Sequence, residues 1–499
     1  MNLKIKDSIQ MDKTLEALAL EIDAAAEDGN ISSLNTLLNK CSNGLETATG
    51  QNRAIFRFFE ANCYSGLAIM RSREPDYEWS WQQDERISEI LSLRKAVLEQ
   101  GFSELEPVFQ CKILTNLGSR LNSLGRFVEA IKYWDAALEI IPNFAMALGN
   151  KGVGLIYYGQ SLYDYSHKGI LTAHAMGELN NAISKGALWD SGTHPEAKDH
   201  FKQYYDGSVK HLKDIEYNFD FDLDQWPLGE SDEDVDYRGW CLRHQLFLSP
   251  LNDVCRHTAA AQDVIHLPNH TYNINEELRF PKYFNLLKQE YVTARYMLFE
   301  AINDENEHIS DKDVLLLSGF DGVQFGYRSE QLKTAYRLLY SLFDKIALFL
   351  NNYFSVGLKA GSVSFRQIWG KIKNKQFELY PCFEKSKNWP LRGLYYLSKD
   401  LFDEVFIDVS LPDAQELASL RNRIEHRFLS LQDYASTVEN TDTHSYITIA
   451  DFEEKTLRII SMAREALIYL SLAMYREEAI RDNDKDSDKL SVPIQSMPI

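Results

Sequence analysis

The sequence predicts an all-α protein in which a helical solenoid is followed by a helical bundle. Apolar residues recur at intervals of three and four along most of the 499-residue chain, which is the spacing of one buried helix face. These segments form pairs joined by short turns in the first half and become longer in the second half. With 44% hydrophobic and 12% aromatic residues the chain can bury ample apolar surface, and its length indicates two or three domains.

Residues 1–215 carry the paired helices, most clearly at residues 114–142. There Gly118 and Ala130 are small enough to let two antiparallel helices approach, and Trp134 fills the groove between them. This pattern resembles the tetratricopeptide repeat, one copy of which cannot bury its own apolar face. Neighbouring segments with related patterns occupy residues 14–46, 54–100 and 145–185 and a closing helix that starts near residue 193.

Residues 216–278 are predicted to be an acidic linker and an irregular connecting segment. Its carboxylates are Asp220, Asp222, Asp224, Glu230, Asp232, Glu233, Asp234 and Asp236. Because such a run repels itself, it favours an exposed connection over a metal loop. Four potential zinc ligands follow, namely Cys241, His244, Cys255 and His257. Two ligands one residue apart rarely converge on one tetrahedral ion, so no cofactor is expected.

Residues 279–482 are predicted to form the helical bundle. Long apolar periodicities occupy residues 281–301, 330–353, 390–402, 413–431 and 449–482. Packed up and down, such helices share one core. Residues 483–499 are polar and then contain proline, and we expect them to be a disordered tail.

The fourth of these helices carries the most informative residues of the chain. Its apolar stripe consists of Leu417, Leu420, Ile424, Phe428 and Leu431, and this stripe is predicted to face the core. His426 then projects on the opposite side with Asn422 one turn away, while Arg421 and Glu425 lie on the flank. The spacing alone fits either a solvated helix face with an Arg421–Glu425 pair or a catalytic site.

The segment from Arg421 to His426 resembles the R-x4-6-H signature of the HEPN superfamily. Residues 332–347 also resemble the long core helix of bacterial proteins in which a tetratricopeptide domain is fused to a HEPN domain. This resemblance implies an RNA endonuclease of the bacterial defence type, toxic to its own host when active. It further implies a homodimer that brings both motifs into one cleft.

The side chains suit RNA cleavage by attack of the 2′-OH. This reaction needs a group that exchanges protons near neutral pH, which imidazoles in general can do, and a cation that stabilises charge on the phosphorane, which a guanidinium can do. His426 and Arg421 supply these two groups. No metal is needed. We expect Asn422 and Glu425 to support these two residues, and Arg423 and Arg427 to bind RNA.

Composition indicates how the protein would contact nucleic acid and where in the cell it is expected. A net charge of -20 argues against a protein that coats nucleic acid, so RNA contacts would be local. Six scattered cysteines and a start without an apolar leader favour a cytoplasmic protein, and no membrane contact is expected. The leading hypothesis is a dimeric endoribonuclease regulated by its solenoid. The alternative is a non-catalytic dimeric adaptor whose solenoid binds a protein or peptide partner.

Overall fold

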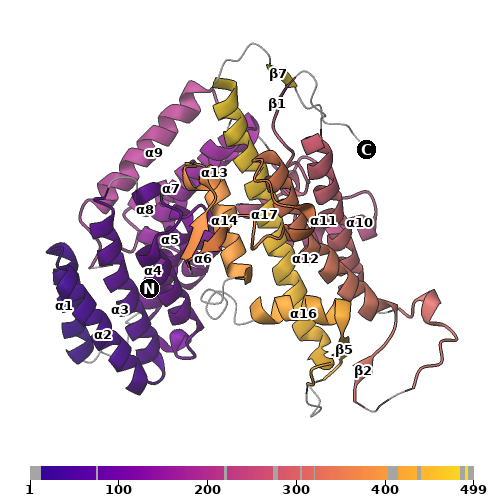
Figure 1. Ribbon diagram of the computed structural model, residues 1–499. Helices are drawn as coiled ribbons and strands as arrows, with labels where there is room; N and C mark the ends of the chain where they lie inside the picture. The colour runs from indigo at the N-terminus through magenta and orange to yellow at the C-terminus, as the bar shows by residue number, and fades with distance from the viewer. Residues whose placement is uncertain are drawn as a thin grey trace. The chain divides into compact units, whose positions relative to one another are not determined.

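The computed structural model describes residues 13–74, 77–190, 192–218, 222–273, 279–303, 306–317, 319, 321–374, 376–402, 414–434, 440–483 and 489–492. This described part is mostly helical, which confirms the all-α prediction (Figure 1). Within it, no helix combines the length and apolar character that a membrane span requires. Contacts divide the chain into two units. The first consists of Met1–Gln160 and Lys168–Tyr217, and the second of Ser161–His167 and Asn218–Ile499.

The first unit is a succession of helices joined by short turns. They are α1 (Lys13–Glu27), α2 (Ile31–Thr47), α3 (Gln51–Arg71), α4 (Asp84–Leu98), α5 (Pro107–Ser123), α6 (Phe127–Ile140), α7 (Ala145–Ser161), α8 (Tyr165–Ile183) and α9 (Ala197–Asp214). Sequence neighbours pack on one another, as α3 does on α4 and α5 does on α6. Buried clusters then continue from α5 through α7 to α9. A continuous core of this kind is what stacked helical pairs require.

The close approach of α5 and α6 depends on Gly118, as its position in the sequence predicts. A Cβ atom at this position would lie 2.8 Å from Nε1 of Trp134 and 3.0 Å from the carbonyl oxygen of Ala130. Trp134 is buried in the groove. Even an added methyl group would therefore push the two helices apart.

The second unit is a helical bundle arranged around one long helix. Its helices are α10 (Asp232–Arg243), α11 (Arg279–Asn303), α12 (Tyr327–Tyr353), α13 (Pro381–Glu384), α14 (Trp389–Phe402), α16 (Ala414–His426) and α17 (Ile449–Asn483). α17 packs against α11, α12 and α14. Nearly every side chain from Ile459 to Met474 is buried, so this stretch is surrounded by its neighbours on all sides.

Among the described residues of the second unit are also three small sheets, which the sequence pattern did not predict. β5 (Phe428–Gln432) runs parallel to β6 (His444–Thr448) and antiparallel to β2 (Val323–Gln324). β3 (Gly370–Lys373) and β4 (Gln376–Leu379) form a hairpin.

The last sheet pairs β1 (His270–Asn273) with β7 (Lys489–Val492). β7 lies in the tail for which the sequence predicted disorder. The expectation for residues 484–488 and 493–499 falls outside the described residues.

Part of the acidic run is the start of a helix, where an exposed connection was expected. α10 begins at Asp232, and the Ser231 side chain accepts a hydrogen bond from the Asp234 N–H group. Acidic residues in a first turn are stabilised by the positive end of the helix dipole. The carboxylates at Asp232, Glu233 and Asp234 therefore favour this helix start. Asp220 lies outside the described residues.

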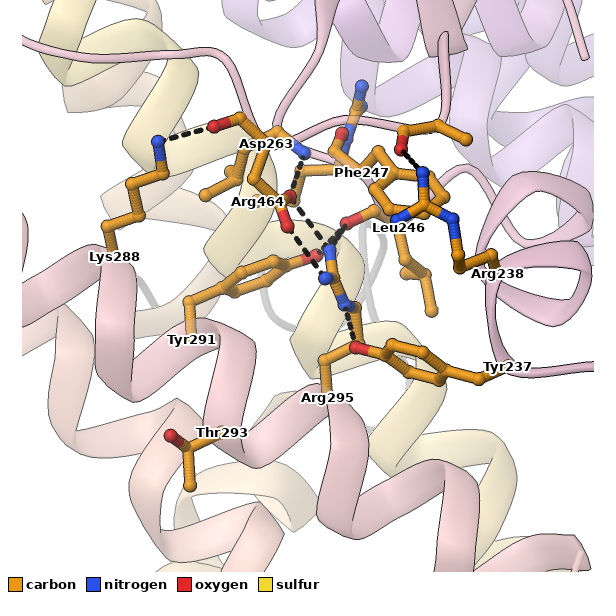
Figure 2. A network of polar contacts seen from close by, with 12 residues as sticks. Tyr237, Arg238, Leu246, Phe247, Asp263, Lys288, Tyr291, Thr293, Arg295 and Arg464 are labelled. Atoms are coloured by element: carbon orange, nitrogen blue, oxygen red, sulfur yellow. Dashed lines mark hydrogen bonds and ion pairs between the residues drawn. The ribbon is translucent and has the colours of Figure 1, made fainter. Parts of the chain in front are cut away.

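Two buried arginines hold the irregular segment after α10 onto the bundle (Figure 2). Arg295 of α11 donates to both carboxylate oxygens of Asp263, at 2.9 and 2.7 Å, and to the Leu246 carbonyl oxygen at 2.9 Å. Arg464 of α17 donates to the Phe247 carbonyl oxygen at 2.6 Å and to Asp253 Oδ1 at 2.6 Å. These bonds make the segment an integral part of the second unit.

Candidate active site

The helix that carries the Arg–His motif is anchored at its start and exposed at its end. Leu417 and Leu420 are buried, and the Tyr336 hydroxyl of α12 donates a 2.7 Å hydrogen bond to the Leu417 carbonyl oxygen. α16 also packs against α14. The first part of the predicted apolar stripe is therefore correct, and it fixes the orientation of the helix. Residue 413, where the helix was predicted to begin, lies outside the described residues.

The predicted stripe is wrong beyond Ile424, because the helix ends at His426. Phe428 begins strand β5, and its side chain is 72% exposed instead of buried. Leu431 is buried, but from the strand. Both residues fit helical spacing from Ile424, yet the alternation of exposed and buried side chains in β5 has a period of two. The motif thus lies where a helix passes into a sheet.

Glu425 links the two residues that were predicted to be catalytic. Its Oε2 atom lies 3.4 Å from Nε of Arg421 and 3.7 Å from Nε2 of His426. The His426 side chain is 73% exposed, and those of Arg421 and Glu425 are 36% and 32% exposed. The guanidinium and the imidazole therefore lie near one carboxylate at the protein surface, and both are accessible to solvent.

Arg421 also contacts the core of the bundle. Its guanidinium carbon lies 5.8 Å from the ring centroid of Tyr340 on α12, within the range of a cation–π contact. Burial raises the pKa of Tyr340, the carboxylate of Asp344 raises it further, and the positive charge of Arg421 acts in the opposite direction. Tyr340 is thus a neutral aromatic surface beneath the arginine.

The supporting residues lie on the same short stretch of helix. Asn422 is exposed, Arg423 is half-buried, and Arg427 is exposed directly after the last helical residue. The Arg427 N–H group donates to the Arg423 carbonyl oxygen at 2.9 Å, which closes the final turn. Arg423 and His426 thus lie in the last turn of α16, where the helix dipole favours positive charge, with Arg427 directly after it.

The sheet that follows α16 presents further polar and aromatic side chains, which sequence reasoning missed. Leu429 and Leu431 of β5 and Ile447 of β6 are buried on the inner face. The outer face carries Phe428, Ser430, His444 and Tyr446, which we call the outer sheet face. The sequence carries little signal for these strands, because Phe428 and Leu429, and likewise Tyr446 and Ile447, are adjacent apolar residues that interrupt an alternation of polar and apolar side chains.

His444 is held in place on this outer sheet face. Its Nε2 atom lies 2.8 Å from the Ser430 hydroxyl, and its ring stacks on Tyr446 with centroids 4.3 Å apart. Phe428, Ser430 and His444 line one side of a cavity of about 860 Å³. Phe325 and Tyr327, at the end of β2 and the start of α12, also line it. Phe428, the first residue of β5 and one of those that line the cavity, follows the last residue of α16 by two positions.

The residues that could have held zinc do not form a site. Cys241 and Cys255 are buried, and burial raises the pKa of both thiols, to about 11 for Cys241. His257 Nδ1 lies 2.6 Å from Asp224 Oδ2. Across the part of the chain that the structure describes, no group of three or more His, Cys, Asp or Glu side chains is placed to hold a metal ion.

Most of the bundle is similar to a known family of protein domains. Residues 271–477 match the model of the LA2681-like HEPN family, so the chain carries a HEPN-like domain over less than half of its length. The match includes α11, α12, α14, α16 and both strands of the outer sheet face. No curated protein and no solved structure matches the chain.

Proposed function

We propose that this protein is a metal-independent endoribonuclease in which Arg421 and His426 act on the scissile phosphodiester. The observation that carries the proposal is the exposed Arg421–Glu425–His426 cluster at the end of α16, within the residues that match a HEPN family. HEPN domains are generally ribonucleases, which favours this activity over other uses of an arginine beside a histidine.

In the proposed reaction the 2′-oxygen of the ribose attacks the adjacent phosphorus. A general base takes the 2′-OH proton, the bond between phosphorus and the 5′-oxygen breaks, and a general acid protonates that oxygen. The products are a 2′,3′-cyclic phosphate and a 5′-hydroxyl. Arg421 stabilises the negative charge that develops on the phosphorane oxygens.

One chain supplies a single His426, whereas this reaction uses both a base and an acid. We propose that a two-fold homodimer brings two copies of α16 together, so that one His426 acts as base and the other as acid. The exposure of His426 and of the arginines around it supports a site that a second copy can complete. By its resemblance, the enzyme would be a defence or toxin effector restrained by the N-terminal helical unit.

The test is incubation of the purified full-length protein with total cellular RNA in the presence of EDTA. We expect fragments with 2′,3′-cyclic phosphate ends, and we expect His426→Ala to lower the cleavage rate by about 10²–10⁴-fold. His200→Ala, at an exposed histidine on α9, is the matched control and retains the wild-type rate. Loss of cleavage on chelation, or full activity of His426→Ala, would contradict the mechanism.

The adaptor remains the second candidate, because the first unit contains a cavity of about 490 Å³. Residues of α7, α8 and α9 line it, among them Ile156, Thr172, Tyr204 and His211. An adaptor predicts no RNA cleavage by the wild type and loss of the dimer in His426→Ala. Light scattering measures the molar mass of the protein in solution and so tells a monomer from a dimer. Together with the cleavage assay it distinguishes the two functions.

A further inference from the structure

The outer sheet face has the composition of a base-stacking surface. The parallel register sets Phe428 opposite His444 and Ser430 opposite Tyr446. The ring centroids of Phe428 and His444 lie 6.1 Å apart, and His444 stacks on Tyr446. Phe428 and His444 meet edge to face, with an interplanar angle of 64°. Proteins that bind single-stranded nucleic acid use exposed aromatic side chains on strands, because every base has a flat apolar face.

The aromatic side chains around the cavity are exposed although the bundle core is well packed. Phe428 is 72% exposed, and Phe325 and Tyr327, which also line the cavity, are exposed as well. The cavity opens because β2 pairs with only the last two residues of β5, and the chain then turns into α12 at Tyr327. Clustered exposed aromatics beside a cavity indicate a binding site.

The charges around the cavity favour a base over a phosphate. Asp311, Asp321 and Glu330 line it, with Lys333 as the only Lys or Arg among its described lining residues. Lys333 is already paired with Glu330 at 2.8 Å. Carboxylates repel phosphate but accept hydrogen bonds from the amino groups of bases. The cavity therefore suits the uncharged, donor-bearing part of a nucleotide.

The groups that suit phosphate lie next to this cavity. Arg423 lies in the last turn of α16, Arg421 lies just before that turn, and Arg427 follows the helix directly. Phe428 follows His426 by two residues, a span of at most about 7 Å. The Phe428 N–H group donates to the Thr443 carbonyl oxygen at 3.0 Å, which fixes the start of the sheet beside the motif.

We propose that the outer sheet face binds an unpaired base of single-stranded RNA, next to the phosphodiester held at Arg421 and His426. This inference rests on the proposed ribonuclease function and adds the surface that holds the base next to the cleaved bond. Phe428 stacks on the base, the His444 ring, which lies edge-on to Phe428, extends this aromatic surface, and the acidic residues of the cavity accept the amino hydrogens of the base. A duplex keeps its bases stacked internally and cannot present one to this surface.

The test measures RNA binding without cleavage, in the full-length His426→Ala protein. A short labelled single-stranded oligoribonucleotide and the same sequence as a duplex are titrated by fluorescence anisotropy. Phe428→Ala and His444→Asn, each added to His426→Ala, are expected to weaken single-strand binding by about tenfold and to leave duplex binding unchanged. Asparagine keeps a hydrogen-bonding partner for Ser430, so His444→Asn tests stacking more than folding. Tyr283→Ala, at an exposed aromatic residue on α11, is the matched control and binds as its parent does.

The outcomes separate this inference from the function on which it rests. Undiminished single-strand affinity in both variants, an equal loss in Tyr283→Ala, or no binding by the parent overturns the stacking surface. Cleavage by the wild type with undiminished binding by the variants leaves the ribonuclease intact and removes the inference. Binding that depends on Phe428 and His444 without any cleavage by the wild type supports the surface and refutes the enzyme.

Discussion

Two arginine–carboxylate pairs in the second unit differ in almost every physical respect. Arg295 is 2% exposed and makes two hydrogen bonds to Asp263, at 2.9 and 2.7 Å, in the network of Figure 2. Arg421 is 36% exposed, and its Nε atom lies 3.4 Å from Glu425. The first pair has the geometry of a bidentate charge-assisted interaction, whereas the second pair is longer and more exposed to solvent.

This difference indicates which pair builds the protein and which is available to a substrate. Arg295 also donates to the Tyr237 hydroxyl at 2.9 Å and to the Leu246 carbonyl oxygen, so most of its donors are committed to the fold. A substrate phosphate would have to displace those bonds. Around Arg421 a phosphate would compete with one weakly held carboxylate, that of Glu425, while the contact with the Tyr340 ring uses none of the guanidinium hydrogen-bond donors. The strong, buried ion pair of Arg295 and Asp263 thus stabilises the fold, whereas the weak, exposed ion pair of Arg421 and Glu425 lies in the candidate site.

Breaking the buried pair should have the largest effect on stability. Arg295→Met leaves the Asp263 carboxylate without its main partner in a mostly buried position. We expect the free energy of unfolding to fall by about 3–5 kcal/mol, measured by chemical denaturation. A loss below about 1 kcal/mol would show that water reaches the pair and that the comparison with Arg421 is mistaken.

A double variant tests whether the lost stability comes from the unpaired charge. Arg295→Met combined with Asp263→Leu removes both charges, so a large part of the lost stability should return. If the double variant is as unstable as the sum of the single variants, packing and not charge pairing explains the effect.

Acid should weaken the buried pair in a defined direction. Burial alone would raise the pKa of Asp263, but the charge and hydrogen bonds of Arg295, the Leu248 N–H group and Lys288 together lower it. Because the folded pKa is below the unfolded value of about 3.9, the pair contributes stability above that value and loses it as pH falls through the folded pKa. The melting temperature of Asp263→Asn should therefore depend less on pH than that of the wild type below about pH 4. Equal slopes would contradict the assignment.

The sequence predicted the helices of both units because local periodicity decides them. Gly118 and Trp134 revealed the close helix pair, and Leu417 and Leu420 revealed the anchored part of α16. Local patterns could not predict the end of α16, since Phe428 fits helical spacing and only pairing with residues 444–448 makes it a strand. The outer sheet face depends on the same distant pairing.

The buried network was beyond sequence reasoning for a related reason. Asp263 lies in a segment without regular periodicity, and its partner Arg295 is 32 positions away on α11. The candidate site was accessible because Arg421, Glu425 and His426 are close in sequence and their helix is regular. The sequence could therefore predict the residues of the site on α16, but not the outer sheet face next to them.

The smallest effect on stability is expected at the exposed pair of Arg421 and Glu425. There a substitution should change activity without changing stability. Glu425→Gln keeps the shape of the side chain and removes its charge, so the free energy of unfolding should change by less than about 0.5 kcal/mol. In the proposed enzyme, Glu425 positions Arg421 and His426, and its loss should lower kcat about tenfold with little change in KM. Glu454→Gln, at another glutamate of the second unit, controls for a general loss of negative charge. A change in stability as large as that of Arg295→Met would place Glu425 among the residues that build the fold. An unchanged kcat would remove its positioning role.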